Sequence, residues 1–321
     1  MLRFICRALL LLAAAAPLAA QSAPAPDKSA EAPIVRLSGY AQVRETYQTD
    51  IGLTASINRA RLAAGGAVAP GLTWRIQGEF RTGSAGAGSA TVSLQDAYVR
   101  YAPRGPWALE AGQFKTPFTR EFTTSLTVVE TADRSTVVDS LAPKRDIGLM
   151  GEYTMHRIAT LYTGVFNGEG QNVTANRDST VLGVARLVVR PIAGVSLGAN
   201  LARYFGDSTR YGADANYEAH GFVARGEYVA GSRDGIDAPV DEGWYALAGY
   251  FLIPSVQLVG KYEWFTRDAV SPQRKNRAWT AAVNAYPWSR RTRCVLEYIS
   301  RKIGAPGIRR GEVLAQFQVT F

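Results

Sequence analysis

Residues able to act as catalytic bases, nucleophiles or metal ligands at neutral pH are scarce in this sequence. It holds 2 His, 2 Cys and 3 Met among 321 residues. His156 and His220 lie in short segments of turn composition, away from any group of candidate nucleophiles, so we interpret them as solvated turn residues. Cys6 and Cys294 form no paired metal signature. The sequence thus argues against a metalloenzyme or a hydrolase, and predicts no catalytic residue and no cofactor.

Basic side chains are instead abundant. Lys and Arg total 36 against 27 Asp and Glu, and the formal net charge is +9. Most of those expected to face an interior are Arg, whose planar fork suits oxyanions and phosphate. They are spread singly along the chain instead of clustering on one face, which argues against nucleic acid as a partner. The residues that we expect to bind anions are Arg59, Arg61, Arg75, Arg81, Arg100, Lys115, Arg120, Arg134 and Arg145.

Alternation of apolar and polar residues with a period of two recurs beyond residue 34, and it indicates strands with two different faces. In the final segment Val313, Phe317 and Val319 fall on one face, with Gln316 and Gln318 on the other. We predict sixteen strands of about 11 residues each, the tilted length that crosses a bilayer. They are expected near 34–47, 57–68, 72–81, 91–102, 107–115, 146–154, 158–167, 180–190, 195–205, 209–217, 222–230, 243–253, 256–266, 277–287, 291–302 and 311–321.

The connections between these strands alternate between short and long. Short ones carry turn residues, as in Ala69-Pro70-Gly71 and Pro254-Ser255. Long ones are predicted at 48–56, 82–90, 116–145, 168–179, 231–242 and 267–276. This pattern is typical of a transmembrane antiparallel β-barrel of the bacterial outer membrane. A soluble β-sandwich is the alternative, but it rarely needs strands of this length.

Aromatic residues fall mainly near the ends of the predicted strands. Rings at headgroup level form such girdles in outer-membrane barrels, although the ordinary strand preference of aromatic residues explains part of the pattern. The residues concerned are Trp74, Tyr101, Trp107, Tyr153, Phe222, Trp264, Trp279, Tyr286, Trp288 and Phe321.

With the apolar face toward lipid, the polar face encloses a lumen that is wide enough at about sixteen strands to admit water. Arg186, Arg190, Arg225 and Lys261 are further candidates for this inner face. Cations that line a pore favour anions. The alternative is that lumen charges pair across the barrel and hold it open, and neither role excludes the other.

The segment 116–145 is too long for a plain hairpin connection. It carries enough apolar residues, among them Phe118, Phe122 and Val138, to fold against a wall. We therefore expect a long third extracellular loop folded into the lumen, with Lys115, Arg120, Arg134 and Arg145 at the narrowest point. A flap on the outer surface is the alternative.

The N-terminus has the order of a secretory signal peptide: Arg3 and Arg7, then the apolar stretch 8–16, then small residues up to Ala20. An uncleaved anchor would need a longer apolar run. We predict a signal peptide at 1–20, a flexible Ala/Pro-rich periplasmic leader at 21–33, and one barrel domain at 34–321. Without Arg3 and Arg7 the charge is 34 − 27 = +7. Cys294 would then have no partner for a disulfide.

Several stretches resemble the phosphate-selective porins O and P of Gram-negative outer membranes. They are Leu94-Gln95-Asp96-Ala97-Tyr98-Val99, Gly112-Gln113-Phe114-Lys115-Thr116-Pro117-Phe118, Arg145-Asp146-Ile147-Gly148, Phe222 with Gly226-Glu227-Tyr228, and Gly249-Tyr250-Phe251-Leu252. Together they span most of the chain after the leader. The most specific is the Gly-Gln-Phe-Lys-x-Pro-Phe stretch ahead of a long loop. The sequence departs from the family in lacking a helical heptad region before the first strand and in interleaving its basic residues with acids.

The resemblance implies a sixteen-stranded homotrimeric porin in outer-membrane lipid, exported through the periplasm, with an arginine-lined pore. It implies passive diffusion of small anions such as phosphate or polyphosphate. Phe321 is similar to the C-terminal aromatic that outer-membrane proteins present to the barrel assembly machinery. A general non-specific porin is the alternative, and a barrel-embedded hydrolase or a structural barrel with a closed lumen would be a different class.

Overall fold

The computed structural model describes residues 35–82, 90–177, 179–233, 241–267, 275–304 and 307–321. The predicted signal peptide and the whole of the predicted leader lie outside the described residues. The strands are β1 (Arg36–Gln48), β2 (Gly52–Ala69), β3 (Leu72–Thr82), β4 (Ala90–Tyr101), β5 (Trp107–Lys115), β6 (Arg145–Met155), β7 (Ala159–Phe166), β8 (Leu182–Val189), β9 (Val195–Tyr204), β10 (Ser208–Ala219), β11 (Phe222–Arg233), β12 (Asp241–Ile253), β13 (Val256–Arg267), β14 (Lys275–Ala285), β15 (Thr292–Ile303) and β16 (Ile308–Thr320). Two short helices, α2 (Arg120–Thr123) and α3 (Thr136–Leu141), lie between β5 and β6.

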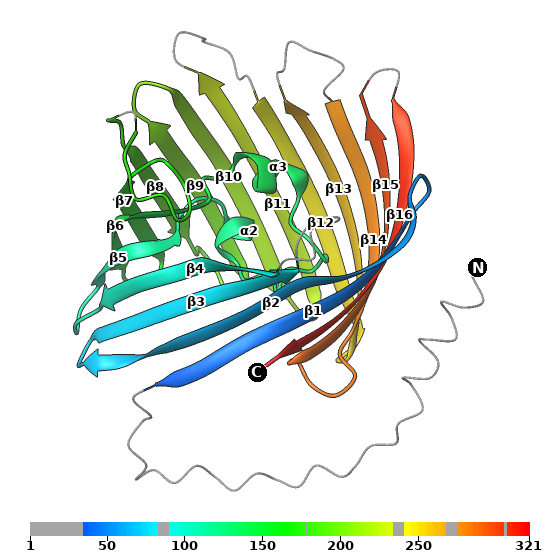
Figure 1. The fold of residues 1–321 in the computed structure, drawn as a ribbon, viewed down its shortest axis with the longest axis horizontal. Helices are drawn as coiled ribbons and strands as arrows, with labels where there is room; N and C mark the ends of the chain where they lie inside the picture. Colours follow the sequence, from blue (N-terminus) through cyan, green and yellow to red (C-terminus); the bar gives the residue numbers. More distant parts are fainter. Residues whose placement is uncertain (1–34, 83–89, 178, 234–240, 268–274, 305–306) are drawn as a thin grey trace, which may run out of the picture. The chain divides into compact units, whose positions relative to one another are not determined.

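The sixteen strands form one closed antiparallel barrel in which each strand pairs with its neighbours in the sequence, and β1 pairs with β16 (Figure 1). At the seam Tyr40 lies opposite Thr320. The Gly39 N–H donates to the Phe321 carbonyl at 2.9 Å, and the Phe321 N–H donates back at 3.0 Å. Closure leaves no free sheet edge, because every strand has two partners. The predicted barrel of sixteen strands is confirmed.

One connection differs from the prediction. The prediction of a long loop at 48–56 is wrong. β2 begins at Gly52, and Gly52 pairs with Gln48 across a turn of three residues. Gly52 has a φ of +90°, which suits the tight turn. Leu53 and the three small residues after it have the composition of a loop, but they pair with β1 as part of strand β2.

The two faces of the wall differ in polarity. Along β13 and β14 the outward side chains include the exposed Leu258, Trp279 and Val283. Inward positions hold buried polar residues, for example Lys261 on β13 and Asn284 on β14. An apolar outer face and a polar inner face suit a barrel whose wall contacts lipid. Among the described residues, no helix is long and apolar enough to cross a membrane.

Short turns join the strands at one end of the barrel. His156 and His220 both lie in such turns, exposed and with positive φ values of 46° and 51°. The longest described connections, 116–144 and 167–181, lie at the other end. In outer-membrane barrels the short turns face the periplasm, so we expect the long connections at the extracellular end.

Candidate functional site

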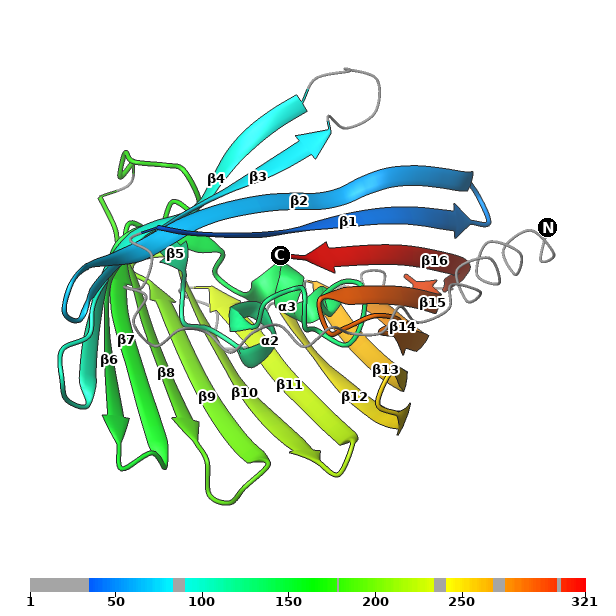
Figure 2. The same cartoon turned by 90° about the horizontal axis from the view of Figure 1, so that it is seen from below.

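The segment between β5 and β6, residues 116–144, packs into a buried apolar cluster with the wall. Phe118 and Val138 are both fully buried. They belong to the same cluster as Val229, Tyr245 and Phe265, which lie on β11, β12 and β13. In both views α2 and α3 lie within the outline formed by the strands (Figures 1 and 2). The same cluster includes wall residues from β5 to β14, so the apolar side chains of the segment pack against a large part of the wall.

Buried arginines of β11 and β15 hold the middle of this segment. Arg225 donates to the Glu130 carboxylate at 2.8 and 2.6 Å. Arg293, which is 1% exposed, donates to the backbone carbonyls of Val129 and Glu130, each at 2.6 Å. Asn284 of β14 donates to the Glu130 carbonyl at 2.8 Å. A guanidinium can satisfy two carbonyls at once, so one residue fixes two consecutive peptide groups.

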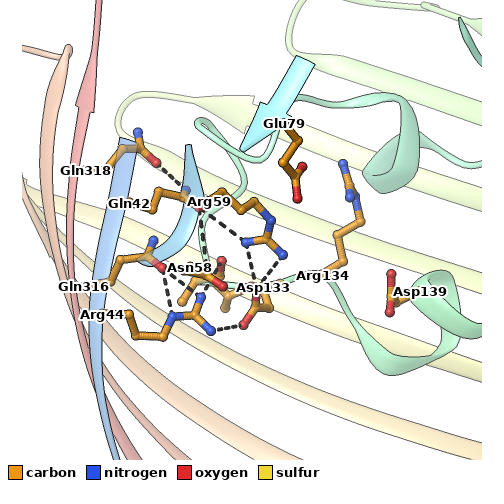
Figure 3. Close-up of polar contacts among 12 residues, drawn as sticks. Gln42, Arg44, Asn58, Arg59, Glu79, Asp133, Arg134, Asp139, Gln316 and Gln318 are labelled. Carbon is orange, nitrogen blue, oxygen red and sulfur yellow. Dashed lines mark hydrogen bonds and ion pairs between the residues drawn. The ribbon is translucent and has the colours of Figure 1, made fainter. Parts of the chain in front are cut away.

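A second anchor joins the segment to β1 and β2 (Figure 3). Arg44 donates to Asp133 at 2.6 Å, and Arg59 donates to the same carboxylate at 3.1 Å. Burial raises the pKa of Asp133, but the hydrogen bonds and charges of Arg44 and Arg59 outweigh it and hold that pKa below its usual value. The neighbouring Ala132 N–H donates to Glu297 of β15 at 2.9 Å.

Carboxylates of the wall hold the two helices. The Glu121 N–H donates to Glu227 at 2.5 Å, and the Thr136 hydroxyl donates to Glu263 at 2.5 Å. The Glu121 side chain accepts from the N–H and hydroxyl of Ser135 at 2.9 and 2.6 Å. Burial raises the pKa of Glu121. The segment is thus bonded to β1, β2, β11, β13, β14 and β15.

An open cavity of about 530 Å³ lies beside the segment, along β1 to β9. Among the described residues that line it, seven are basic and two are acidic. The basic residues are Arg61, Arg75, Lys115, Arg120, Arg145, Arg186 and Arg190, and the acidic ones are Asp96 and Glu110. The tyrosines Tyr40, Tyr98 and Tyr162 also contribute to the wall. The positive charge suits the cavity to anionic solutes.

Three of these cations have close carboxylate partners. Arg61 pairs with Glu79, and its Nε lies 2.5 Å from a carboxylate oxygen. Arg145 pairs with Asp96 at 2.7 Å. Arg186 pairs with Asp214 at 2.5 Å and also donates to Asn200. Charges in such pairs are largely neutralised, so these residues shape the wall more than they attract solutes.

The other four cations lack such close compensation within the described residues. Arg75 lies 3.9 Å from Asp96, and its side chain is about a third exposed. Arg190 donates to the Thr160 hydroxyl at 3.1 Å, and Lys115 donates to the carbonyls of Thr123 and Thr124 at 3.2 and 2.9 Å. Arg120 makes no side-chain hydrogen bond or ion pair with described residues. Arg75, Lys115, Arg120 and Arg190 are named the open cations below.

The structure divides the nine residues that the sequence predicts to bind anions. Those that line the cavity are Arg61, Arg75, Lys115, Arg120 and Arg145. Arg59 pairs with Asp133, while Arg100 pairs with Glu152 at 2.7 Å, beside a separate hollow at the short-turn end. The Arg81 side chain lies outside the described residues.

Arg134, which is predicted to lie at the narrowest point, is absent from the lining of this cavity. It donates to the carbonyls of Glu121, Phe122 and Thr124 at 2.9, 3.2 and 3.0 Å, and it stacks 5.2 Å from the Phe122 ring. Burial lowers its pKa to about 10, which still leaves it charged at neutral pH. Arg134 therefore stabilises the fold of the segment.

Arg186 and Arg190 line the cavity but are missing from the predicted anion-binding set. Their spacing of four residues could have indicated this role, because it puts both side chains on the same face of the strand. Arg186 lies on the inward face of β8, and Arg190 directly follows the end of that strand. No sequence pattern singles out Tyr40, Tyr98 or Tyr162.

Comparison with known proteins identifies related sequences and folds. The family described as phosphate-selective porin O and P matches residues 37–217. No curated protein gives a significant sequence match.

Solved outer-membrane structures share the fold. The outer-membrane OmpT of Vibrio cholerae superposes with a TM-score of 0.67 at 10% identity, covering 91% of this chain and 99% of that one. The outer-membrane channel DcaP of Acinetobacter baumannii gives 0.65 at 14% identity, with 89% and 97% covered. A protein of Comamonas acidovorans described as an anion-selective porin gives 0.62 at 13% identity, with 89% and 99% covered. At these identities the similarity establishes the barrel fold.

Proposed function

Because the chain belongs to the phosphate-selective porin O and P family, we propose that it is a water-filled channel for passive diffusion of small anions, with phosphate or polyphosphate as preferred solutes. The family and the closed barrel establish an outer-membrane channel protein. Anion preference and the residues responsible for it are the proposal.

The observation that carries the proposal is the composition of the cavity wall, with seven basic and two acidic residues. An excess of fixed positive charge in a confined aqueous space raises the local concentration of anions. The open cations have donors that a passing oxyanion can use, and guanidinium groups bind oxyanions through paired hydrogen bonds. The Comamonas acidovorans porin, described as anion-selective, supports the same direction of selectivity.

We assign the segment 116–144 the role of narrowing the channel. Its bonds to strands on several sides of the barrel support this role, because a segment so held reduces the open cross-section. Lys115 and Arg120 stand at the border between the segment and the cavity, where an anion would pass closest. The expectation that this border is the constriction remains a prediction.

The proposal includes a homotrimer in outer-membrane lipid. A trimer form is described for the Vibrio cholerae OmpT, which shares the barrel fold. Separately, Phe321 is 63% exposed just after β16, so its side chain is available to the barrel assembly machinery.

The number of chains in the proposed trimer can be measured directly. Light scattering on the detergent-solubilised protein would measure the number of chains, and one chain per particle would contradict the trimer.

The reversal potential in a planar bilayer under a KCl gradient tests the selectivity. We expect an anion-favouring potential, and we expect added phosphate to block the chloride current. A variant with Arg75→Gln and Arg120→Gln should lose most of the block and keep its conductance. R157Q/R291Q, which also removes two charges but from exposed turns, is the matched control. Anion preference without block would contradict the phosphate preference.

A general porin is the second candidate, favoured by the pairs Arg61–Glu79, Arg145–Asp96 and Arg186–Asp214 that neutralise part of the wall. It predicts weak selectivity and no block by phosphate. Absence of channel steps from a correctly folded barrel would instead support a closed structural barrel.

A further inference from the structure

The outer face of β12 to β15 carries a band of aromatic side chains near the long-connection end. Trp244, Tyr262 and Trp279 follow one another on β12, β13 and β14, with ring centroids 5.3 and 4.4 Å apart. Trp279 is 66% exposed and Tyr298 on β15 is 51% exposed. Tryptophan and tyrosine concentrate at the headgroup level of a membrane. This aromatic band therefore marks the outer-leaflet interface on this part of the wall.

A row of three cations lies next to this band, on the side of the long connections. Arg277 on β14 is paired in register with Lys302 on β15, and Lys302 with Arg309 on β16. All three residues are exposed. Arg277 and Trp279 are two positions apart on the same face, so the row lies about 7 Å beyond the aromatic band. We call Arg277, Lys302 and Arg309 the outer cation row.

The outer cation row makes no ion pair or side-chain hydrogen bond with any described residue. Its immediate neighbours do: Arg301 lies 3.5 Å from Glu263, and Arg310 lies 3.3 Å from Asp50. Like charges directly opposite each other on neighbouring strands repel. Three cations in register on a face turned to lipid therefore need an external anion.

We propose that the outer cation row binds the phosphorylated headgroups of lipids in the outer leaflet. The row lies at the extracellular end and just beyond an interfacial aromatic band, where such headgroups reside. Strand spacing places the three cations about 5 Å apart, close enough for one headgroup with two phosphates to contact more than one of them. Exposed Trp279 and Tyr298 offer the adjacent lipid chain an apolar surface.

Native mass spectrometry of the folded protein in detergent tests the proposal, with diphosphoryl lipid A, monophosphoryl lipid A and phosphatidylcholine as probes. We expect retention in that order. The variant R277Q/K302Q/R309Q should retain at least tenfold less diphosphoryl lipid A. The control R301Q/R310Q removes two charges from the alternate positions and should retain as much as wild type.

The proposal would be overturned if the triple variant retained as much diphosphoryl lipid A as wild type. It would also be overturned if the control R301Q/R310Q lost as much of this lipid as the triple variant. Displacement of lipid A by millimolar inorganic phosphate would show a site for free anions instead. A change from trimer to monomer in the triple variant would assign the row to contact between copies. The three single variants supply the same comparison if the triple variant does not fold, which heat-dependent gel mobility reports. Reversal potential should not change, so failure here is separable from failure of the proposed channel function.

Discussion

Two sectors of the barrel use arginine in opposite ways. Along β11 to β16 and β1, Arg225 lies 2.6 Å from Glu130 and Arg44 lies 2.6 Å from Asp133. Arg293 in the same sector donates its hydrogen bonds to backbone carbonyls of the segment. Along β3 to β8, Arg75 is 3.9 Å from Asp96, and Arg120 of α2, which faces the same cavity, makes no ion pair with a described residue. The first is called the locked wall and the second the open wall.

The difference shows that the role of a lumen arginine depends on its partners, which are acids or carbonyls of the segment 116–144, acids of the wall, or none of these among the described residues. Glu130 and Asp133 satisfy the cations of the locked wall, which positions the segment. On the open wall, Arg145 and Arg186 pair with wall acids, whereas Arg75 and Arg190 lack such close partners among the described residues and their charges remain available to solutes. We expect substitutions on the locked wall to change stability and those on the open wall to change selectivity.

The largest expected effect follows from Arg293→Leu on the locked wall. It leaves the Val129 carbonyl without its donor and weakens the hold on Glu130. Loss of buried hydrogen bonds to a charged group predicts destabilisation of about 3 kcal/mol. Urea unfolding of the barrel refolded into lipid vesicles measures it. Arg291→Gln in the adjacent exposed turn should stay within about 0.5 kcal/mol of wild type, and an equal loss would remove the distinction between the two sites.

A smaller loss is expected for Glu130→Gln. Arg225 would lose one carboxylate but keep Glu218 at 3.0 Å, so we expect about 1–2 kcal/mol. The matched control is Glu218→Gln, which removes the other partner of the same arginine. Its side chain is 63% exposed, which predicts an effect under about 0.5 kcal/mol. Similar unfolding midpoints for the two variants would show that contact with the segment adds nothing.

Arg190→Gln tests whether a cation of the open wall affects selectivity and leaves stability unchanged. Thr160 is its one described side-chain partner, so stability should change by under about 0.5 kcal/mol. Removing an uncompensated charge beside the path should lower the anion-to-cation permeability ratio about twofold. Bilayer recordings measure the ratio, with Arg157→Gln in an exposed turn as the control. An unchanged ratio would exclude Arg190 from the anion path.

The smallest expected effect is a pH dependence carried by Asp133. Its pKa is lower in the folded protein, so its stabilising contribution is present above the unfolded pKa and is lost as pH falls through the folded pKa. The side chain is 44% exposed, and screening limits the contribution to about 0.3 kcal/mol. Asp133→Asn should therefore flatten the stability profile below about pH 4. If the stability of the variant fell with pH as steeply as that of wild type, the pH dependence could not be assigned to Asp133.

The alternation of side chains predicted most of the strands, because two-faced strands leave a period of two in the sequence. The prediction of the strand near 209–217, which is β10, also used the even strand number expected of such barrels. The start of β2 was missed, since Gly52-Leu53-Thr54-Ala55-Ser56 has the composition of a loop although it pairs with β1. Strand identity is local, and local patterns report it well.

The division into a locked and an open wall could not be predicted. It depends on contacts between residues far apart in the sequence, such as Arg225 with Glu130, 95 positions away, and Arg44 with Asp133, 89 positions away. The fold of segment 116–144 decides which arginine meets which acid. Arg134 illustrates this, because its carbonyl partners belong to the segment itself.

The central claim is that the open wall sets the charge preference of the channel. Reversal potentials under one KCl gradient test it most directly, for wild type, for R75Q/R120Q, and for R44Q/D133N, which removes one charge of each sign from the locked wall. The account predicts an anion-favouring potential in wild type and R44Q/D133N and a clear shift toward zero in R75Q/R120Q. A cation-favouring wild type, or equal shifts in both variants, would contradict it.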